Sequence, residues 1–403
     1  QTCALPIWLS VLTGLVVGGA SAVFAGCIKA ATEYRDTHNW IFMLLPVAGV
    51  LIVFMYEKIG RQDGGTNQVL ATIKSKDDVP FLSAPLIFVS TLLTHLTGGS
   101  AGREGASIQF GGSIGNWLGK LAHLDEFDHH VMIMCGMSAA FAAVFGTPMA
   151  AAVFAMEVVS VGVMYYAALL PCVIASIIAA EFATGMGIDP ETFPVHSIPG
   201  LTVETGLKMA LIAVGCGILS ILFCILLKTV GQLYTKYLKN PYIRIVVAAG
   251  VIILLTICLN TKDYMGAGSG LIARAIEKGE ARPLDFLWKM LLTALTMRAG
   301  YRGGEIVPAF SIGATFGCVA GGILGFSPEL AAAASMVALF CGVTNCPITA
   351  MLISFELFGF SGAAYYLIAI SISYAVSGYY SLYKDQTIVY SKYKARYINR
   401  KTR

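Results

Sequence analysis

The fold is decided by a stretch that reads Gly98-Gly99-Ser100-Ala101-Gly102-Arg103-Glu104-Gly105-Ala106-Ser107. It closes an uncharged run, Pro80 to Gly102, that is long enough to span a bilayer. Carboxylates inside a membrane are costly and usually mark an ion or proton path. A glycine-lined helix start also offers free backbone N–H groups to an anion. We therefore interpret Glu104 and its neighbouring amides as the working centre of an anion transporter.

The composition excludes a soluble domain and predicts an all-α polytopic membrane protein. Of 403 residues, 57% are hydrophobic and only 12% are charged. Helices are expected because a bilayer offers no water to the backbone, and the alternating pattern of a membrane barrel is absent. The other uncharged runs are Ala4–Ile28, Ile41–Tyr56, Val131–Met156, Val158–Ala180, Met209–Leu227, Ile245–Thr261, Ile306–Pro328, Leu330–Phe355 and Leu357–Tyr383.

Charge and cysteine usage favour no soluble partner. The formal net charge of +4 does not indicate a nucleic-acid partner, and the ten cysteines include no C-x-x-C pair, so we expect no disulfide, metal site or cofactor. Positive charge gathers in residues 384–403, which predicts a cytoplasmic tail. A generic basic tail attracted to anionic lipid is the alternative, and it faces the same way.

An internal repeat is the most informative feature of the chain. Three motif members recur in order, Glu104 with Glu305, Pro148 with Pro347, and Glu157 with Glu356. Their offsets are 201, 199 and 199 residues, which is strong evidence of duplication. Repeats in transporters commonly have inverted topology, with broken helices that meet at the midplane. We predict a first half at 1–190, a connector at 191–204, a second half at 205–383, the basic tail, and no soluble regulatory domain.

These residues also resemble a known family. Gly102-Arg103-Glu104-Gly105-Ala106 is similar to the G-R-E-G-P signature of the CLC chloride channels and anion/proton antiporters. Gly136–Glu157 resembles the following CLC helix, Gly303–Pro308 stands where that family has G-G-x-F-x-P, and Ser381-Leu382-Tyr383 matches the start of its last helix. The resemblance covers about residues 60–390.

The resemblance implies a homodimer with one anion path per subunit. The family's gating glutamate falls on Glu104, whose protonation would open the path. Anions would be bound by the amides of Ile306 and Val307 and by the Tyr383 hydroxyl. Gly105 and Ala106 supply the amides at the first helix start. A small halide, most simply chloride, and protons are the implied partners, in the plasma membrane.

Four departures qualify the resemblance. Ala106 replaces a proline, and Thr66 is a candidate for the missing serine ligand, near Gly64-Gly65-Thr66-Asn67. The inner proton-relaying glutamate of many antiporters falls on Val158, which cannot carry a proton. Glu305 is a carboxylate at a position where the commoner family members have an apolar residue. In this respect the sequence resembles the fluoride/proton antiporter branch, which has a glutamate there.

Several residues carry a structural alternative beside a functional one. Glu305 is either a proton- or anion-linked group or a helix cap paired with Arg302. Glu157 and Glu356 are expected to pair with a basic residue or a helix end, and Arg103 with a loop carboxylate or backbone carbonyls. Tyr379 and Tyr380 are alternatives to Tyr383 as the tyrosine that binds the anion. His95 is expected to be a core histidine with satisfied hydrogen bonds rather than a ligand.

The sequence therefore predicts a CLC-type transporter of small inorganic anions that is not an enzyme. Chloride transport is the first expectation, by a channel or a chloride/proton antiporter. Fluoride/proton exchange is the main alternative. An intramembrane enzyme is the remote one, because no nucleophile and base are expected on facing helices. A transporter of organic substrates should show more polar side chains where the repeats meet.

Overall fold

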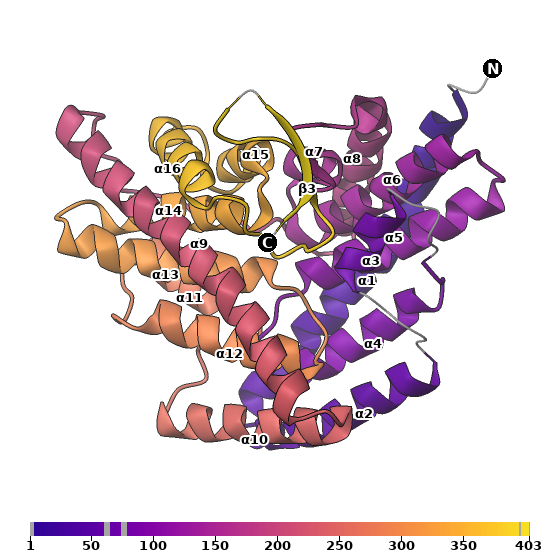
Figure 1. The fold of residues 1–403 in the computed structure, drawn as a ribbon, viewed down its shortest axis with the longest axis horizontal. Helices are drawn as coiled ribbons and strands as arrows, with labels where there is room; N and C mark the ends of the chain where they lie inside the picture. The colour runs from indigo at the N-terminus through magenta and orange to yellow at the C-terminus, as the bar shows by residue number, and fades with distance from the viewer. Residues whose placement is uncertain (1–3, 60–64, 74–78, 395, 403) are drawn as a thin grey trace.

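The computed structural model describes residues 4–59, 65–73, 79–394 and 396–402, and it confirms the all-α fold (Figure 1). The α-helices are α1 (Ala4–Thr37), α2 (Leu45–Lys58), α3 (Thr66–Thr72), α4 (Ser83–Leu96), α5 (Glu104–Leu121), α6 (Glu126–Phe145), α7 (Pro148–Glu157), α8 (Leu169–Gly185), α9 (Val203–Tyr237), α10 (Pro241–Cys258), α11 (Ser269–Glu277), α12 (Asp285–Ala299), α13 (Ile306–Ile323), α14 (Pro328–Thr344), α15 (Pro347–Phe358) and α16 (Ala363–Val376). Shorter elements are η1 (Ile41–Leu44), η2 (Tyr166–Ala168), β1 (Ser160–Val161), β2 (Thr387–Tyr390) and β3 (Tyr397–Lys401).

The helices fall into two sets of eight that follow one another in the same order. Helices α1 to α8 correspond to α9 to α16, and the packing repeats as well: α1 packs on α8 as α9 packs on α16, and α5 packs on α6 as α13 packs on α14. Corresponding helices also meet each other directly, α2 with α10, α5 with α13 and α7 with α15. These reciprocal contacts are those of two halves related by a twofold axis. The residue boundaries assigned to the halves above stay a prediction.

One face of α9 shows why the molecule needs a bilayer. Seven apolar side chains at spacings of three or four residues are exposed on it: Val203, Leu207, Leu211, Val214, Ile218, Leu222 and Ile225. The opposite face carries Ile212, Cys216, Leu219 and Phe223, which are buried. The helix has 35 residues, roughly 50 Å at 1.5 Å per residue, so it must tilt in a hydrocarbon core of roughly 30 Å. Seven of the described helices are long and apolar enough to cross a membrane.

Two glutamates lock the halves together at α7 and α15. Glu157, at the end of α7, accepts hydrogen bonds from the amides of Ile348 (3.1 Å) and Thr349 (2.9 Å) at the start of α15. Glu356, near the end of α15, accepts from the amides of Met149 (2.8 Å) and Ala150 (2.9 Å) at the start of α7. Each carboxylate thus caps the positive end of the partner helix. The sequence predicted that each glutamate pairs with a basic residue or with a helix end. In the structure both pair with helix ends.

The basic tail is an ordered part of the fold. Strand β2 pairs in parallel with β1, directly after α7, and antiparallel with β3. The Gln386 amide group, fully buried, donates to the carbonyls of Val158 (3.0 Å) and Thr344 (2.7 Å). Lys392 donates to Asn345 Oδ1 and to the Tyr374 carbonyl oxygen. The tail therefore joins the ends of α7 and α14, which belong to different halves.

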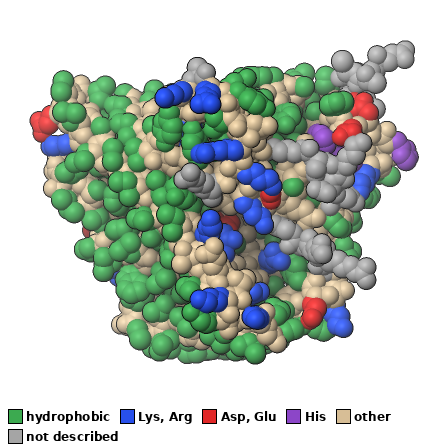
Figure 2. Space-filling model, in the orientation of Figure 1, with side chains coloured by type: hydrophobic (Ala, Val, Ile, Leu, Met, Phe, Trp, Pro, Cys, Tyr) green, Lys and Arg blue, Asp and Glu red, His purple; other side chains and the backbone are tan. Residues whose placement is uncertain are grey.

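Positive charge gathers on the face of the molecule that carries the tail. Figure 2 shows Lys and Arg side chains along the middle of the face that carries the tail, with hydrophobic side chains at the margins. Lys384, Lys394, Arg396 and Lys401 of the tail are exposed. By the positive-inside tendency, the expectation that this face is the cytoplasmic one stays a prediction.

The partly buried Lys392 predicts a pH-dependent stability. Burial lowers the pKa of Lys392 from its ordinary value of 10.5 to about 8. Between these two values the unfolded chain binds more protons than the folded one, so the free energy of unfolding rises with pH across this window, by about 3 kcal/mol in full. Thermal unfolding of wild type and Lys392→Met, followed from pH 7.5 to 10.5, should show the wild-type midpoint rising relative to the variant.

The exposed Lys394→Met variant is the matched control and should follow the wild type over the same range. Parallel curves for wild type and Lys392→Met would contradict the prediction.

Candidate functional site

The site is built on a backbone crossing of the two halves. Gly102 N donates to Gly304 O (2.8 Å), and Gly304 N donates to Gly102 O (2.7 Å). Helices α5 and α13 begin two residues beyond this antiparallel bridge, at Glu104 and Ile306. A Cβ on Gly304 would lie 2.5 Å from Gly105 N, and one on Gly105 would lie 2.8 Å from Gly304 Cα. Glycine is required here because each neighbour is backbone, which cannot move aside.

The crossing brings two helix N-termini to one place. The first amides of a helix have no acceptor within the helix, and they carry partial positive charge. In α5 these are the amides of Glu104, Gly105 and Ala106, and in α13 those of Ile306 and Val307, before Pro308. The side chains or α-carbons of Gly105, Ala106, Ile306 and Val307 are all buried. An anion held there would meet amide dipoles without a full cation, which allows it to leave.

Glu104 sits on this crossing with its side chain 1% exposed. Its Oε2 accepts from Arg103 N (3.0 Å). A Cβ on Gly102 would lie 2.9 Å from that Oε2 and 3.0 Å from Pro308 Cδ. The carboxylate is therefore folded back over Gly102, next to the first turn of α13. When ionised, this carboxylate places a negative charge beside the free amides of both helix starts.

Arg103 is held by the expected kinds of partner. Its guanidinium donates to Glu191 Oε1 (2.9 Å) and to the Val144 carbonyl oxygen (3.3 Å). Its Nε also lies 3.4 Å from Glu104 Oε1. Glu191 comes from the segment between α8 and α9, so the Arg103 side chain fixes the motif against that segment.

Glu305 differs from Glu104 in its surroundings. It is the residue before α13, and its side chain is 21% exposed. The basic partner is Arg298, at 3.6 Å, whereas the expected partner Arg302 stacks over the Tyr56 ring at 3.9 Å. The pairing with Arg302 is therefore wrong. Arg298 lies at the end of α12, one turn before Arg302, and that turn contains Gly300 with a φ of 124°. This backbone bend separates the two arginines.

The structure brings Thr66 to the crossing and buries Tyr383. Tyr383 is 4% exposed, and its carbonyl oxygen accepts from Gln386 N (3.2 Å) and Thr402 Oγ1 (2.7 Å). Tyr379 instead bonds Ser391 (2.8 Å). Thr66 Oγ1 donates to the Gly105 carbonyl oxygen (3.1 Å), so it supports the start of α5. Gly64, next to the expected anion loop, lies outside the described residues. Anion binding by Thr66 and Tyr383 stays a prediction.

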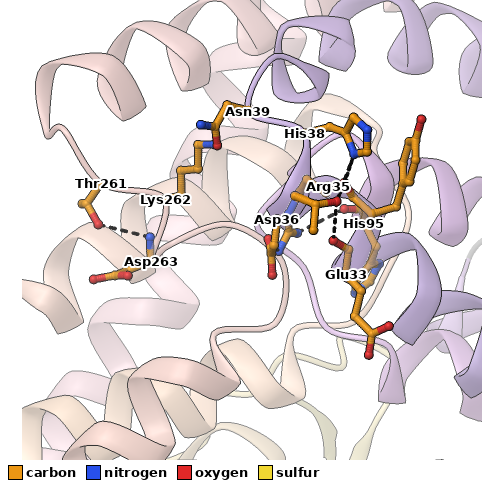
Figure 3. A network of polar contacts seen from close by, with 11 residues as sticks. Glu33, Arg35, Asp36, His38, Asn39, His95, Thr261, Lys262 and Asp263 are labelled. Atoms are coloured by element: carbon orange, nitrogen blue, oxygen red, sulfur yellow. Dashed lines mark hydrogen bonds and ion pairs between the residues drawn. The ribbon is translucent and has the colours of Figure 1, made fainter.

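A cavity of about 560 Å³ adjoins the motif, and we call it the vestibule. Its wall includes Arg35, His95, Arg103, Glu191, Asp263 and Gly266–Gly270. Figure 3 shows Arg35, on α1, beside Asp36 and His95, with Lys262 next to Asn39 across the cavity. Arg35 donates to Asp36 (2.8 Å) and to the His95 carbonyl oxygen (3.1 Å). Arg103 lines the vestibule and also contacts Glu104, so this cavity lies next to the motif.

Two other residues bear on the expected alternatives. His95 is half satisfied: Nδ1 bonds the Thr91 carbonyl oxygen (2.9 Å), while buried Nε2 has no hydrogen-bond partner in the described structure. Ser113 stands in Gly111-Gly112-Ser113-Ile114-Gly115, which matches the G-x-S-x-G pattern of nucleophile elbows. It lies in the middle of α5 and donates to the Gln109 carbonyl oxygen (2.8 Å), so it is not on a strand-to-helix turn.

Two polar residues near the site were missed by sequence reasoning. Lys289 is buried in α12, and Gln386 is a buried residue of the tail. A lone lysine in the otherwise uncharged stretch 286–297 was a usable signal, because an ionisable residue at membrane depth is a functional candidate by default. Gln386, in a polar tail, gave no such signal.

Two broken helices that cross inside an apolar shell, with a carboxylate over their starts, define an inverted-repeat anion transporter. The model of the voltage gated chloride channel family matches residues 48–378. The chain is 34% identical over 399 residues to a chloride/fluoride channel protein of Pseudomonas syringae pv. tomato, covering 96% of this chain and 87% of that one. It is 25% identical to an H(+)/Cl(-) exchange transporter of Vibrio cholerae, over 87% and 81% of the two chains.

A solved structure agrees with these relatives. The crystal structure of a CLC-type fluoride/proton antiporter superposes with a TM-score of 0.91 at 31% identity, covering 95% of this chain and 98% of that one. The chain belongs to the voltage gated chloride channel family, the CLC family that its motifs resemble. It is a multi-pass membrane transport protein, not an enzyme.

The crossing predicts an intolerance to side chains at Gly304. Gly304→Ala should abolish anion flux and lower the free energy of unfolding by about 1–3 kcal/mol, the usual cost of overpacking. Flux from proteoliposomes and thermal unfolding in detergent measure the two effects.

Gly322→Ala is the matched control. It lies near the end of α13, the helix that Gly304 precedes, and a Cβ there meets nothing within 4 Å. It should keep wild-type flux and stability. If Gly304→Ala protein transported anions as the wild type does, the two helix starts could move apart without loss of function, and the prediction would be wrong.

Proposed function

We propose that this protein exchanges fluoride for protons across the plasma membrane, with Glu104 as the gating and proton-carrying residue. The observation that carries the proposal is the pair of carboxylates at the crossing, Glu104 on α5 and Glu305 before α13. The similarity to a fluoride/proton antiporter of known structure supports it. The sequence favoured chloride over fluoride as the transported ion. For these two reasons we now favour fluoride.

The geometry gives Glu104 two states with different consequences. Ionised, its carboxylate lies over Gly102 and offers negative charge to the same helix starts that an anion needs. Protonated, it loses that charge, and an anion can take its place at the amides of Gly105, Ala106, Ile306 and Val307. One proton is then bound each time the site is opened to an anion, which couples the two movements.

Glu305 suits fluoride better than larger halides. A protonated carboxyl group donates a hydrogen bond, and an ionised one only accepts. Fluoride is the smallest and most charge-dense halide, so it gains the most from a hydrogen-bond donor near the site. Val158 stands where many chloride/proton antiporters have a second glutamate, and the Gln386 amide beneath it carries no titratable proton. Glu305 is thus the second titratable group at this crossing.

Chloride/proton exchange is the second candidate. It is favoured by the similarity to the Vibrio cholerae exchange transporter and by the buried Tyr383, whose hydroxyl the family resemblance implies as an anion ligand. Proteoliposomes under a fluoride gradient and then a chloride gradient, with anion and pH recorded together, separate the candidates. Proton movement driven by fluoride with little chloride flux supports the proposal. Chloride-driven proton movement supports the second candidate, and anion flux without a pH change contradicts both.

Removing the charge of Glu104 should uncouple transport. Glu104→Gln keeps the size and the hydrogen bond from Arg103 N but cannot carry a proton. Anion-driven proton movement should fall by at least about 100-fold, the size typical of a lost proton-transferring group. The exposed Glu204→Gln, a carboxylate paired with Lys208 on α9, is the control and should retain coupling.

Removing the charge of Glu305 should change ion preference rather than abolish the fold. Glu305→Gln leaves a neutral group of equal size beside Arg298. We expect fluoride-driven proton movement to fall by about tenfold or more, the loss of a single hydrogen bond to a charged group being worth about 1.5–3 kcal/mol. Equal fluoride coupling in the variant and the wild type would assign Glu305 a capping role only.

We also propose that the protein is a homodimer with one path in each subunit, as the family resemblance implies. Light scattering in detergent should then give about twice the chain mass of 42.8 kDa. A mass of one chain would contradict the dimer and leave the transport proposal untouched.

A further inference from the structure

We infer that Lys289 is a positioning residue of this transport path, whose buried positive charge favours anions in the vestibule beside Glu104. The inference rests on the proposed function, because it needs anions to pass Glu104. It concerns a group that the gating mechanism above does not use.

Lys289 occupies an unusual place for a charged residue. It lies in the second turn of α12 and is fully buried. Its Nζ donates to Ser100 Oγ (3.0 Å), to the Tyr264 carbonyl oxygen (3.0 Å) and to the Gly266 carbonyl oxygen (2.7 Å). Three oxygen acceptors match the three donors of an ammonium group.

The three acceptors belong to the two segments that frame the vestibule. Ser100 stands four residues before Glu104, in the gating motif, and Gly266 lines the cavity. The two segments also touch directly, because Gly266 N donates to Gly99 O (3.0 Å). Gly268 permits the close approach of the lysine, since a Cβ there would lie 2.9 Å from Lys289 Cε.

The charge of Lys289 is not balanced by a carboxylate. Among the described residues, Lys289 forms no ion pair: the buried Asp285, one turn earlier on α12, accepts instead from the Tyr264 hydroxyl (2.6 Å) and Arg282 N (3.0 Å). The guanidinium groups at the vestibule do form ion pairs, Arg35 with Asp36, and Arg103 with Glu104 and Glu191. Across the cavity the carboxylate of Asp263 is matched by Arg274 (2.9 Å). Buried charges are normally paired. An unpaired one raises the positive potential of the nearest cavity, and it does so strongly where little water screens it.

A purely mechanical role is the alternative, and the same helix supplies the control for it. Thr293 lies one turn further along α12, is also fully buried, and bonds the same Ser100 hydroxyl (3.0 Å). It holds the gating segment as Lys289 does, but it carries no charge. Lys289→Met and Thr293→Val therefore separate the charge from the hydrogen bond.

The experiment measures initial anion flux into proteoliposomes against anion concentration for the full chain. Lys289→Met should raise KM about tenfold, equivalent to 1.4 kcal/mol, with the maximal rate little changed. Lys289→Arg should restore KM, and Thr293→Val should leave it at the wild-type value. Equal changes in KM for Lys289→Met and Thr293→Val, or a change in maximal rate alone, would overturn the inference.

Folding of each variant is checked by gel filtration and thermal unfolding in detergent. Lys289→Gln, neutral but able to hydrogen-bond, replaces Lys289→Met if that variant does not fold. Wild-type flux with no effect of these variants contradicts the inference alone, whereas absence of wild-type flux contradicts the proposed function and the inference with it.

Discussion

Two backbone hydrogen bonds between Gly102 and Gly304 fix the centre of the molecule. They join residues some two hundred positions apart, and they bring the starts of α5 and α13 close enough that only glycine fits at Gly105 and Gly304. Everything proposed for the site follows from this approach. The free amides point to a shared place, and the residues that begin or precede both helices are carboxylates.

The twofold arrangement is strict in the backbone and broken in the side chains. Glu157 and Glu356 cap each other's partner helices with the same geometry. Glu104 and Glu305 occupy matching positions, yet the first is buried under Arg103 while the second is partly exposed beside Arg298. The duplicated scaffold thereby places two carboxylates at matching positions in unlike surroundings.

The architecture was predictable from the sequence because each membrane helix is encoded by a local run of uncharged, apolar residues. Long uncharged runs and the recurring Glu104, Pro148 and Glu157 motifs were sufficient to predict the helices and the repeat. Partners set by tertiary packing were not predictable. Arg298 rather than Arg302 faces Glu305 because of a backbone bend at Gly300, and no sequence spacing reveals which arginine that bend selects. Lys289 became interpretable only when its neighbours Ser100 and Gly266, from two other segments, were known.

The tail offers a different kind of consequence, for biosynthesis. Gln386, Lys392 and strand β2 hold the ends of α7 and α14, but the ribosome makes them after every helix they fasten. The helices can enter the bilayer one after another. The carbonyl groups of Val158 and Thr344, however, lack their hydrogen bonds to Gln386 until the last segment is released. Nascent chains that stop short of β2 would therefore present an unsealed seam between the halves at these two groups, a recognisable mark of incomplete synthesis for the proteases that survey membranes.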